Sequence, residues 1–162
     1  MLEEVKSPHA QHIVGVGGIV IRNHRVLMVK HNYGVHKGCW VLPGGHVNYA
    51  ENLDVAVERE VLEETGITAV ARGVVAVRSQ ILPDFGLEVY IVFLMDYVSG
   101  VETVCPREND AVAYFTREEV VNEIQATPLS RAILDRVMSL QFSFFSLQSD
   151  YKQNGPDYRF YL

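Results

Sequence analysis

The chain of 162 residues has few cysteines and no long hydrophobic run. Its two cysteines, Cys39 and Cys105, are too few for a disulfide framework and lack the spacing of a zinc site. No apolar run approaches the roughly 20 residues that a membrane-spanning helix needs. The N-terminus also lacks the basic segment and apolar stretch of a signal peptide. We therefore expect a cytoplasmic protein with no membrane partner.

Positive charge is also scarce, because 14 Lys and Arg residues stand against 20 Asp and Glu, a formal net charge of −6. This balance argues against a nucleic-acid polymer as partner, since binding its backbone requires many basic side chains. A small anionic nucleotide can still bind an acidic protein when metal ions mediate the contact. The length suits one domain, and no internal repeat or low-complexity linker divides residues 1–162. We expect a single domain.

The most unusual feature of the sequence is a group of glutamates at the end of a predicted helix. Glu60, Glu63 and Glu64 lie at i, i+3 and i+4, so one helical face carries all three carboxylates. Gly66 is expected to end this helix. The carboxylates then lie at the negative pole of the helix dipole, where anionic side chains are disfavoured. A bound divalent cation is the simplest explanation, because Mg²⁺ takes carboxylate and phosphate oxygens as ligands.

The helical phase of these glutamates also favours a site at a cleft. At about 100° per residue, Glu60 and Glu64 continue the apolar stripe of the helix and so point toward the core, at the edge of a cleft. That stripe consists of Leu53, Ala56 and Val57.

Two further features concern the rest of this helix. Val55 and Leu62 form a second apolar strip on the opposite side, which predicts a helix packed between two layers. Arg59 is the only nearby cation, and it is expected to pair with Glu63 at i+4. One arginine cannot neutralise all three glutamates.

Residues 45–67 resemble the complete Nudix box of the MutT-like pyrophosphohydrolases, and a Leu-Pro-Gly lead-in precedes them. Every fixed position of the pattern is filled, the aliphatic positions included. The matching residues are Gly45, Glu51, Arg59, Glu60, Val61, Glu63, Glu64, Gly66 and Ile67.

The resemblance implies a metal site. Glu60 and Glu64 would bind the principal ion, and Glu63 would contribute to a second ion or to its water shell. The carbonyl of Gly45 would complete the coordination, which suits the close backbone approach that a glycine allows. The ion would be Mg²⁺, with Mn²⁺ as the alternative. The implied reaction is attack of a metal-activated water on a diphosphate linkage.

The resemblance also implies catalytic and supporting roles. Arg59 would orient a glutamate, and Glu51 would brace the loop against the helix. The general base is either a box glutamate, with Glu60 and Glu63 as candidates, or an acid on a later loop. The later candidates are Glu108 and Asp110.

The resemblance weakens on that later loop. The acid that the family often carries three residues before an aromatic pair is Ala111 in this chain. The role of a loop acid as the base is therefore left open.

The substrate is expected to be a small nucleotide, either an ADP-ribose-like nucleoside diphosphate derivative or a nucleoside triphosphate. Pro83 resembles a proline of the ADP-ribose-cleaving branch, although a hairpin turn also explains it. Two alternatives remain: a non-catalytic nucleotide-sensing module on the same fold, and a purely structural acidic helix. Candidates for base stacking or for phosphate and sugar contacts are Tyr33, Trp40, Phe85, Arg22, Lys37, Arg78, Gln80 and His46.

Hydrophobic patterning predicts strands around the helix and hence a three-layer α/β/α sandwich with a mixed sheet, the Nudix fold. The glycines at 15, 17 and 18 fit close packing within a strand, because the GxGxxG pattern fails at Val20 and no helix follows. Expected strands are residues 12–21, 25–30, 39–42, 67–81, 87–98 and 111–115, with an acidic helix start at 116–119 and a last helix at 128–140.

From about residue 141 the chain is rich in aromatic residues. Such a tail is not expected to remain exposed to water. It either covers its own core or packs across a homodimer, with a contribution to substrate stacking as a third option. Its aromatic residues are Phe142, Phe144, Phe145, Tyr151, Tyr158, Phe160 and Tyr161.

Overall fold

The computed structural model describes residues 12–82, 86–148, 159 and 161. The predicted helices and strands are present, and their ends lie within two residues of the expected ones. A short π-helix, η1, begins at Glu119, the last residue of the acidic segment at 116–119. The elements are β1 (Ile13–Arg22), β2 (Arg25–His31), β3 (Trp40–Val41), β4 (Gly44–His46), α1 (Leu53–Thr65), β5 (Ile67–Leu82), β6 (Gly86–Gly100), β7 (Asn109–Phe115), η1 (Glu119–Glu123), α2 (Pro128–Met138) and β8 (Phe145–Ser146).

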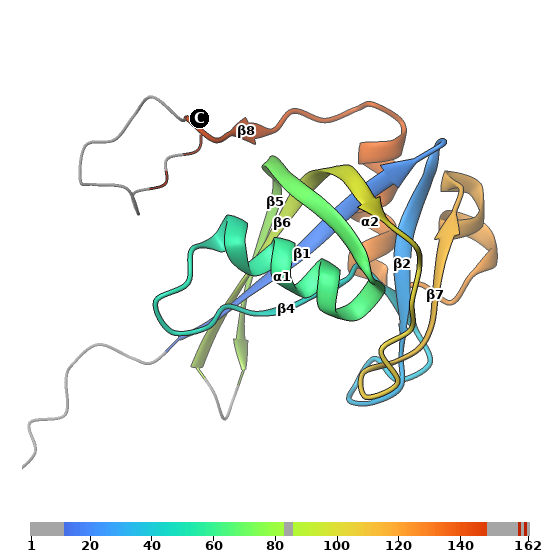
Figure 1. The fold of residues 1–162 in the computed structure, drawn as a ribbon, viewed down its shortest axis with the longest axis horizontal. Coiled ribbons are helices and arrows are strands. Elements are labelled where there is room, and N and C mark those ends of the chain that lie inside the picture. The colour runs from blue at the N-terminus through green and yellow to red at the C-terminus, as the bar shows by residue number, and fades with distance from the viewer. Residues whose placement is uncertain (1–11, 83–85, 149–158, 160, 162) are drawn as a thin grey trace, which may run out of the picture.

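The sheet is mixed, as predicted. Strand β1 runs parallel to β6, from the pair Ile13 and Glu88 to the pair Val20 and Met95, and the other strand pairs are antiparallel. The strand order is β3-β2-β1-β6-β5-β8, with β4 added to β1 and β7 added to β2. The two predicted hairpins, β1–β2 and β5–β6, are both present (Figure 1).

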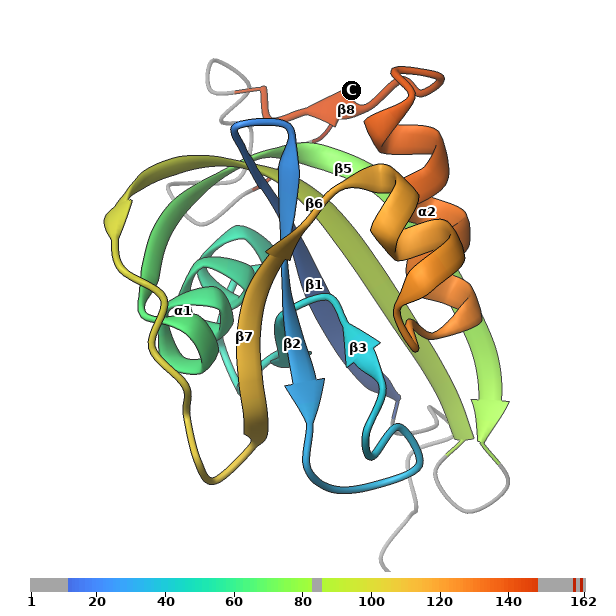
Figure 2. The ribbon, with the colours of Figure 1, turned by 90° about the vertical axis from the view of Figure 1, so that its right-hand side faces the viewer.

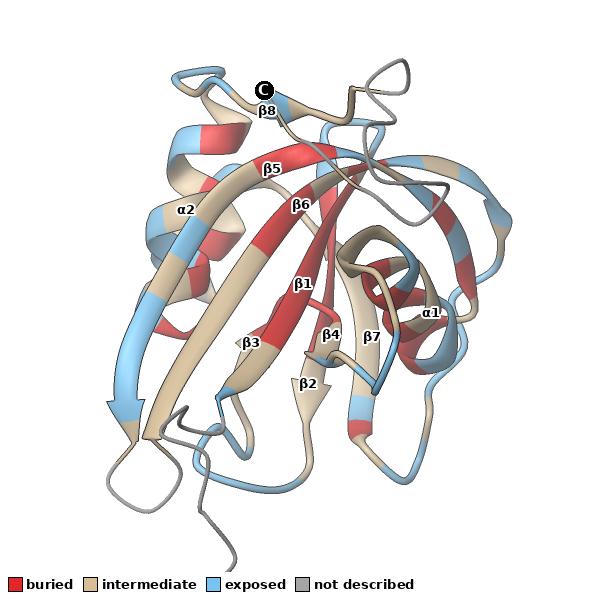
Figure 3. Ribbon diagram, turned by 90° about the vertical axis from the view of Figure 1, so that its left-hand side faces the viewer, coloured by how far each residue is buried: buried red, intermediate tan, exposed pale blue. Residues whose placement is uncertain are grey.

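Helices lie on both faces of the sheet, α1 on one and α2 on the other (Figure 2). Alternate residues of a strand point to opposite faces, and the core is divided accordingly. On β1, Val16 and Val20 pack in the cluster under α1, whereas Ile19 packs in the cluster under α2. Figure 3 shows the buried residues concentrated in the central strands and on the inner sides of the helices. The three-layer architecture is therefore confirmed.

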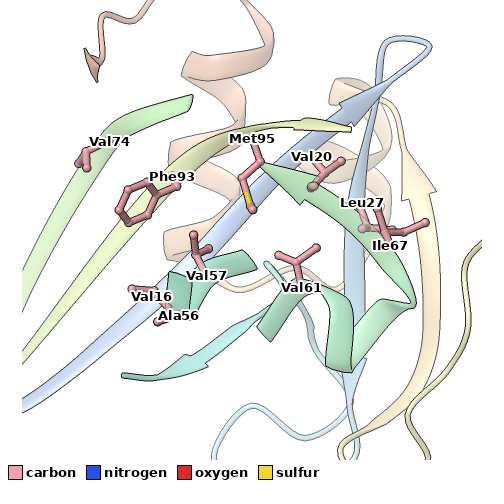
Figure 4. Packing of buried hydrophobic residues seen from close by; sticks show 11 residues of the cluster. Val16, Val20, Leu27, Ala56, Val57, Val61, Ile67, Val74, Phe93 and Met95 are labelled. Carbon is pink, nitrogen blue, oxygen red and sulfur yellow. The ribbon is translucent and has the colours of Figure 1, made fainter. Parts of the chain in front are cut away.

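Helix α1 buries one face against the sheet. Ala56, Val57 and Val61 are fully buried there, and they pack with Phe93 of β6 (Figure 4). Glu60 and Glu64 are buried on the same face, so the predicted stripe is confirmed.

The prediction that α1 packs between two layers is wrong. Val55 and Leu62 are 47% and 48% exposed. The helix packs mainly against β1, β4 and β5 of the sheet, and Asn109 of β7 adds a hydrogen bond to its last turn. Isolated apolar side chains are common on protein surfaces, so the second strip did not require a second layer.

Part of the aromatic tail covers the protein's own core. Tyr161 meets Phe93 edge to face, with ring centroids 5.6 Å apart, and Phe142 packs against the cluster under α2. Phe145 is 59% exposed although its strand pairs with β5. The aromatics at 151, 158 and 160 lie outside the described residues, and the homodimer stays a prediction.

No helix among the described residues is long and apolar enough to cross a membrane.

Gly66 ends α1 in the left-handed conformation, with φ of 71°. We expect Gly66→Ala to destabilise the protein for two reasons. The left-handed backbone costs an L-residue about 1–2 kcal/mol, and a Cβ at this position would lie 2.9 Å from the carbonyl oxygen of Val101. Urea unfolding measures the loss of free energy.

Gly34→Ala is the matched control. Gly34 has a similar φ of 66°, but a Cβ there would meet nothing within 4 Å. The control incurs only the backbone cost, so Gly66→Ala should lose more stability. An equal or smaller loss for Gly66→Ala would show that the contact with Val101 does not constrain the end of α1.

Candidate active site

A cleft of about 910 Å³ brings Glu60 of α1 together with several other parts of the chain. Strand β4 contributes Gly44, Gly45 and His46, the β2–β3 segment contributes His31, Tyr33 and His36, and the β5–β6 hairpin contributes Arg78, Gln80, Glu88 and Tyr90. The start of α2 closes a further wall. Of the predicted site residues, Gly45, Glu60 and Glu108 line this cleft.

Glu64 is the most deeply buried acid of the described residues, with 1% of its surface exposed. Its Oε2 accepts a hydrogen bond of 2.8 Å from the backbone N–H of Gly44. The pKa of Glu64 is raised to about 8, mainly by burial and in addition by the nearby charges of Glu108 and Glu60, whereas the Gly44 bond opposes the shift. The described protein groups therefore do not offset the cost of burying the negative charge of ionised Glu64.

Glu60 lies beside the backbone of strand β4. A Cβ added to Gly45 would be 2.6 Å from the Glu60 carboxylate, so a larger residue there would displace this carboxylate from its present position. Burial raises the pKa of Glu60, although Arg59 opposes the shift through a 2.7 Å hydrogen bond to Oε1. Two partly desolvated carboxylates therefore lie close to the same turn of backbone.

Arg59 is shared among three glutamates. Besides Glu60, it bonds both carboxylate oxygens of Glu51 at 2.8 and 2.9 Å and Glu63 at 3.2 Å. Glu51 in turn accepts a 2.9 Å hydrogen bond from the backbone N–H of Asn48, which ties the loop to the helix. The predicted pair of Arg59 with Glu63 is confirmed, but Glu51 and Glu60 make the shorter contacts.

The structure separates the remaining acids. Glu63 has a side chain 58% exposed and does not line the cleft. Of the two loop acids, Glu108 lines the cleft and Asp110 is exposed outside its lining. Glu108 is also near enough to raise the pKa values of Glu60 and Glu64.

The other predicted contact residues divide in the same way. Tyr33, Arg78, Gln80 and His46 line the cleft. Trp40 instead packs edge-on against Phe115, with centroids 4.6 Å apart. Arg22 and Lys37 do not line the cleft, and residues 83 and 85 lie outside the described part of the chain.

Two neighbours of Glu64 were missed from the sequence. His31 Nε2 lies 4.0 Å from Glu64 Oε1, and the amide of the buried Asn109 donates to the Glu64 carbonyl oxygen at 3.5 Å. They are opposite each other on β2 and β7. Only the pairing of these distant strands brings them together, so no local sequence signal identifies them.

The NUDIX domain model matches residues 11–137 of this chain. The chain belongs to the Nudix hydrolase family.

Curated relatives and solved Nudix structures agree with this assignment. The chain is 34% identical to a MutT-like protein of Streptomyces ambofaciens, over 73% of this chain and 72% of the relative. It is 37% identical to an ADP-ribose pyrophosphatase of Methanocaldococcus jannaschii, over 54% of this chain and only 52% of that protein. A MutT NUDIX hydrolase structure from Burkholderia pseudomallei has a TM-score of 0.68 at 29% identity, covering 78% of this chain and 98% of that one.

Most of the first curated relatives extend well beyond the matched region. Of the first five relatives, all but the Streptomyces protein are covered over only 20–52% of their own length, with 52% for the Methanocaldococcus enzyme. The shared region is therefore the Nudix domain.

The Nudix box residues fit a hard divalent cation in their chemistry. Glu60, Glu64 and the backbone of Gly45 offer only oxygen donors, the type that Mg²⁺ and Mn²⁺ favour. Both carboxylates are partly desolvated, and a cation would lower the cost of ionising them. Within the described residues, no three acidic, His or Cys side chains are gathered in ligating geometry. In this structure Arg59 bonds the Glu60 carboxylate and the Gly44 N–H bonds that of Glu64.

Without divalent ions, Glu64 should destabilise the protein at high pH. The pKa of Glu64 is about 8 in the folded protein, against a usual 4.5. Its contribution to the free energy of unfolding is therefore fully present below pH 4.5 and is lost progressively as the pH rises to about 8. Glu64→Gln removes this loss. In EDTA we expect the variant to exceed the wild type at pH 9 by more than about 1 kcal/mol, and by little near pH 4.5, in urea unfolding.

Glu63→Gln is the control for this measurement, because its side chain lies on the same helical turn but is 58% exposed. It should change stability little at either pH. A Glu64→Gln variant with the same stability as the wild type at pH 9 would contradict the raised pKa.

Proposed function

We propose that this protein hydrolyses a diphosphate linkage in a nucleoside diphosphate derivative, with Mg²⁺ or Mn²⁺ as cofactor. The observation that carries the proposal is the position of two desolvated glutamates, Glu60 and Glu64, beside a cleft large enough for a nucleotide. The complete Nudix box supports hydrolysis over a sensing role, since a sensor would not need every box glutamate.

The bound ion would lower the pKa of a water ligand and balance charge on the phosphate oxygens. Glu60, Glu64 and the Gly45 carbonyl would hold it, and Glu63 would act from the exposed side. Arg59 fixes the Glu60 carboxylate by its 2.7 Å bond, and the Gly44 N–H fixes that of Glu64. Because these charges are already held in position, the site needs little rearrangement of its charged groups as the transition state forms.

Glu108 is the favoured general base among the candidates. It lines the cleft, and its charge acts on both Glu60 and Glu64. A carboxylate in this position would accept a proton from the attacking water. Glu60 and Glu63 remain the alternatives within the box.

The proposed substrate is ADP-ribose or a related compound, with nucleoside triphosphates as the second candidate. The similarity to an ADP-ribose pyrophosphatase supports the first. The cleft also carries Tyr33, which is 52% exposed and lies nearly parallel to His31, at 14° and 5.4 Å. An exposed aromatic ring that is supported from behind suits stacking of a base.

A substrate panel tests the proposed function. ADP-ribose, NADH, dinucleoside polyphosphates, nucleoside triphosphates, oxidised deoxynucleotides and nucleotide sugars are incubated with and without Mg²⁺, and the phosphate products are measured. We expect ion-dependent cleavage of at least one compound. Binding without cleavage would favour the nucleotide sensor, and neither binding nor cleavage would favour a structural role for the acidic helix.

The same assay separates the two loop acids. Glu108→Gln should lower kcat by about 100-fold or more, the usual contribution of a general base, with a much smaller change in KM. Asp110→Asn, two residues further on and outside the cleft lining, should stay within about threefold of the wild type. A wild-type kcat for Glu108→Gln would show that Glu108 is not the general base and would favour the box glutamates in that role.

A further inference from the structure

Three polar side chains of the β5–β6 hairpin form a cluster on one wall of the cleft. The Nε2 of Gln80 donates to Glu88 Oε2 at 2.6 Å, and Arg78 Nη2 lies 2.9 Å from the same oxygen. Gln80 and Glu88 are directly opposite each other across the two strands, so their side chains share one face. All three residues line the cleft.

The cluster leaves one carboxylate oxygen available. Both contacts engage Oε2 of Glu88, and Oε1 accepts no hydrogen bond from the described residues. The Glu88 side chain is only 15% exposed, so it is held in place rather than freely solvated. An ionised acceptor in a fixed position forms strong hydrogen bonds with donors on a ligand.

Tyr90 supports the cluster from below. The Arg78 guanidinium lies over the Tyr90 ring, 5.5 Å from its centroid. The ring itself lies against Gly15 and Gly17 of β1, where a Cβ on Gly17 would overlap the Tyr90 hydroxyl. Arg78 thus covers one face of the Tyr90 ring, which makes this ring less suitable than Tyr33 for stacking with a base.

The strand order places this cluster and Tyr33 on opposite sides of the acidic centre. Gly45, on β4, pairs with β1 on the side away from β6. Glu64 lies between Gly44 of β4, at 2.8 Å, and His31 of β2, at 4.0 Å. Tyr33 stacks on this histidine. Glu88 is on β6. A ligand whose phosphates lie near Gly45 and Glu60 therefore reaches Tyr33 with one end and Glu88 with the other.

We propose that Glu88 is a specificity residue that accepts a hydrogen bond from a ribose hydroxyl of the substrate. A hydroxyl both donates and accepts, so it can donate to Glu88 Oε1 and accept from Arg78 or Gln80. A guanine edge would need both carboxylate oxygens, and Oε2 is already engaged. This inference rests on the proposed function and adds a preference for ribose over deoxyribose.

The test compares kcat/KM for ADP-ribose with that for analogues lacking a single 2′ or 3′ hydroxyl on either ribose, and likewise ATP with 2′-dATP and 3′-dATP. The wild type should discriminate against one deoxy analogue by roughly 10- to 100-fold, the range expected for a hydrogen bond to a charged group. Glu88→Ala should reduce that ratio to below about threefold, mainly by weakening cleavage of the hydroxylated compound through KM.

Asp96→Ala is the matched control. Asp96 also lies on β6 and pairs with an arginine of β5, Arg72, at 3.8 Å, but neither lines the cleft. This variant should keep the wild-type ratio. Thermal unfolding of both variants checks that they are folded.

Outcomes for the proposed function and for the Glu88 inference are distinguishable. Calorimetric titration of the same compounds compares their binding without turnover. If no compound is cleaved, the proposed function fails, whereas tighter binding of the hydroxylated compound that is lost in Glu88→Ala still supports the inference. Three results would overturn the Glu88 inference. The wild type could cleave hydroxylated and deoxy compounds equally well, or Glu88→Ala could leave the ratio unchanged. Alternatively, Glu88→Ala could change the preference for the base and not that for the sugar.

Discussion

The site depends on the burial of a carboxylate that the described protein groups do not neutralise. Glu64 is almost completely enclosed, and its firm partner is a single backbone N–H from Gly44. Arg59, the arginine of the same helix, is engaged by Glu51, Glu60 and Glu63 instead. Isolated buried charges are costly unless they are paired or coordinate a metal. The deficit of positive charge around Glu64 therefore links the fold to a cation-dependent function.

The fold creates this deficit through backbone geometry. Gly66 stops the helix directly after the glutamates, so they lie at the negative end of its dipole. Gly44 and Gly45 then let strand β4 pass close to Glu60 and Glu64, which removes water from the carboxylates. A Cβ on Gly44 would clash with the β1 backbone, and a Cβ on Gly45 would displace the Glu60 carboxylate. The same glycines therefore shape the cleft, in which burial raises the pKa of Glu64 while the Gly44 N–H opposes that shift.

Much of this arrangement follows from sequence, because it is local. The period of α1, its end at Gly66 and the inward direction of Glu60 and Glu64 all result from helical geometry. Contacts between distant strands do not follow in this way: the approach of His31 and Asn109 to Glu64 depends on the pairing of β2 with β7. The exposure of Val55 and Leu62 was also mispredicted, since helical periodicity identifies an apolar strip but not whether another layer covers it. The distinction between Glu108 and Asp110 likewise needed the shape of the cleft.

The most direct test is the titration of the Glu64 carboxyl by ¹³C NMR, with Glu64→Gln used to assign its signal. Without divalent ions, its pKa should be about 8, and saturating Mg²⁺ should lower it strongly, because a nearby cation favours the ionised form. A pKa near the usual 4.5 in the metal-free protein, unchanged by Mg²⁺, would contradict the account.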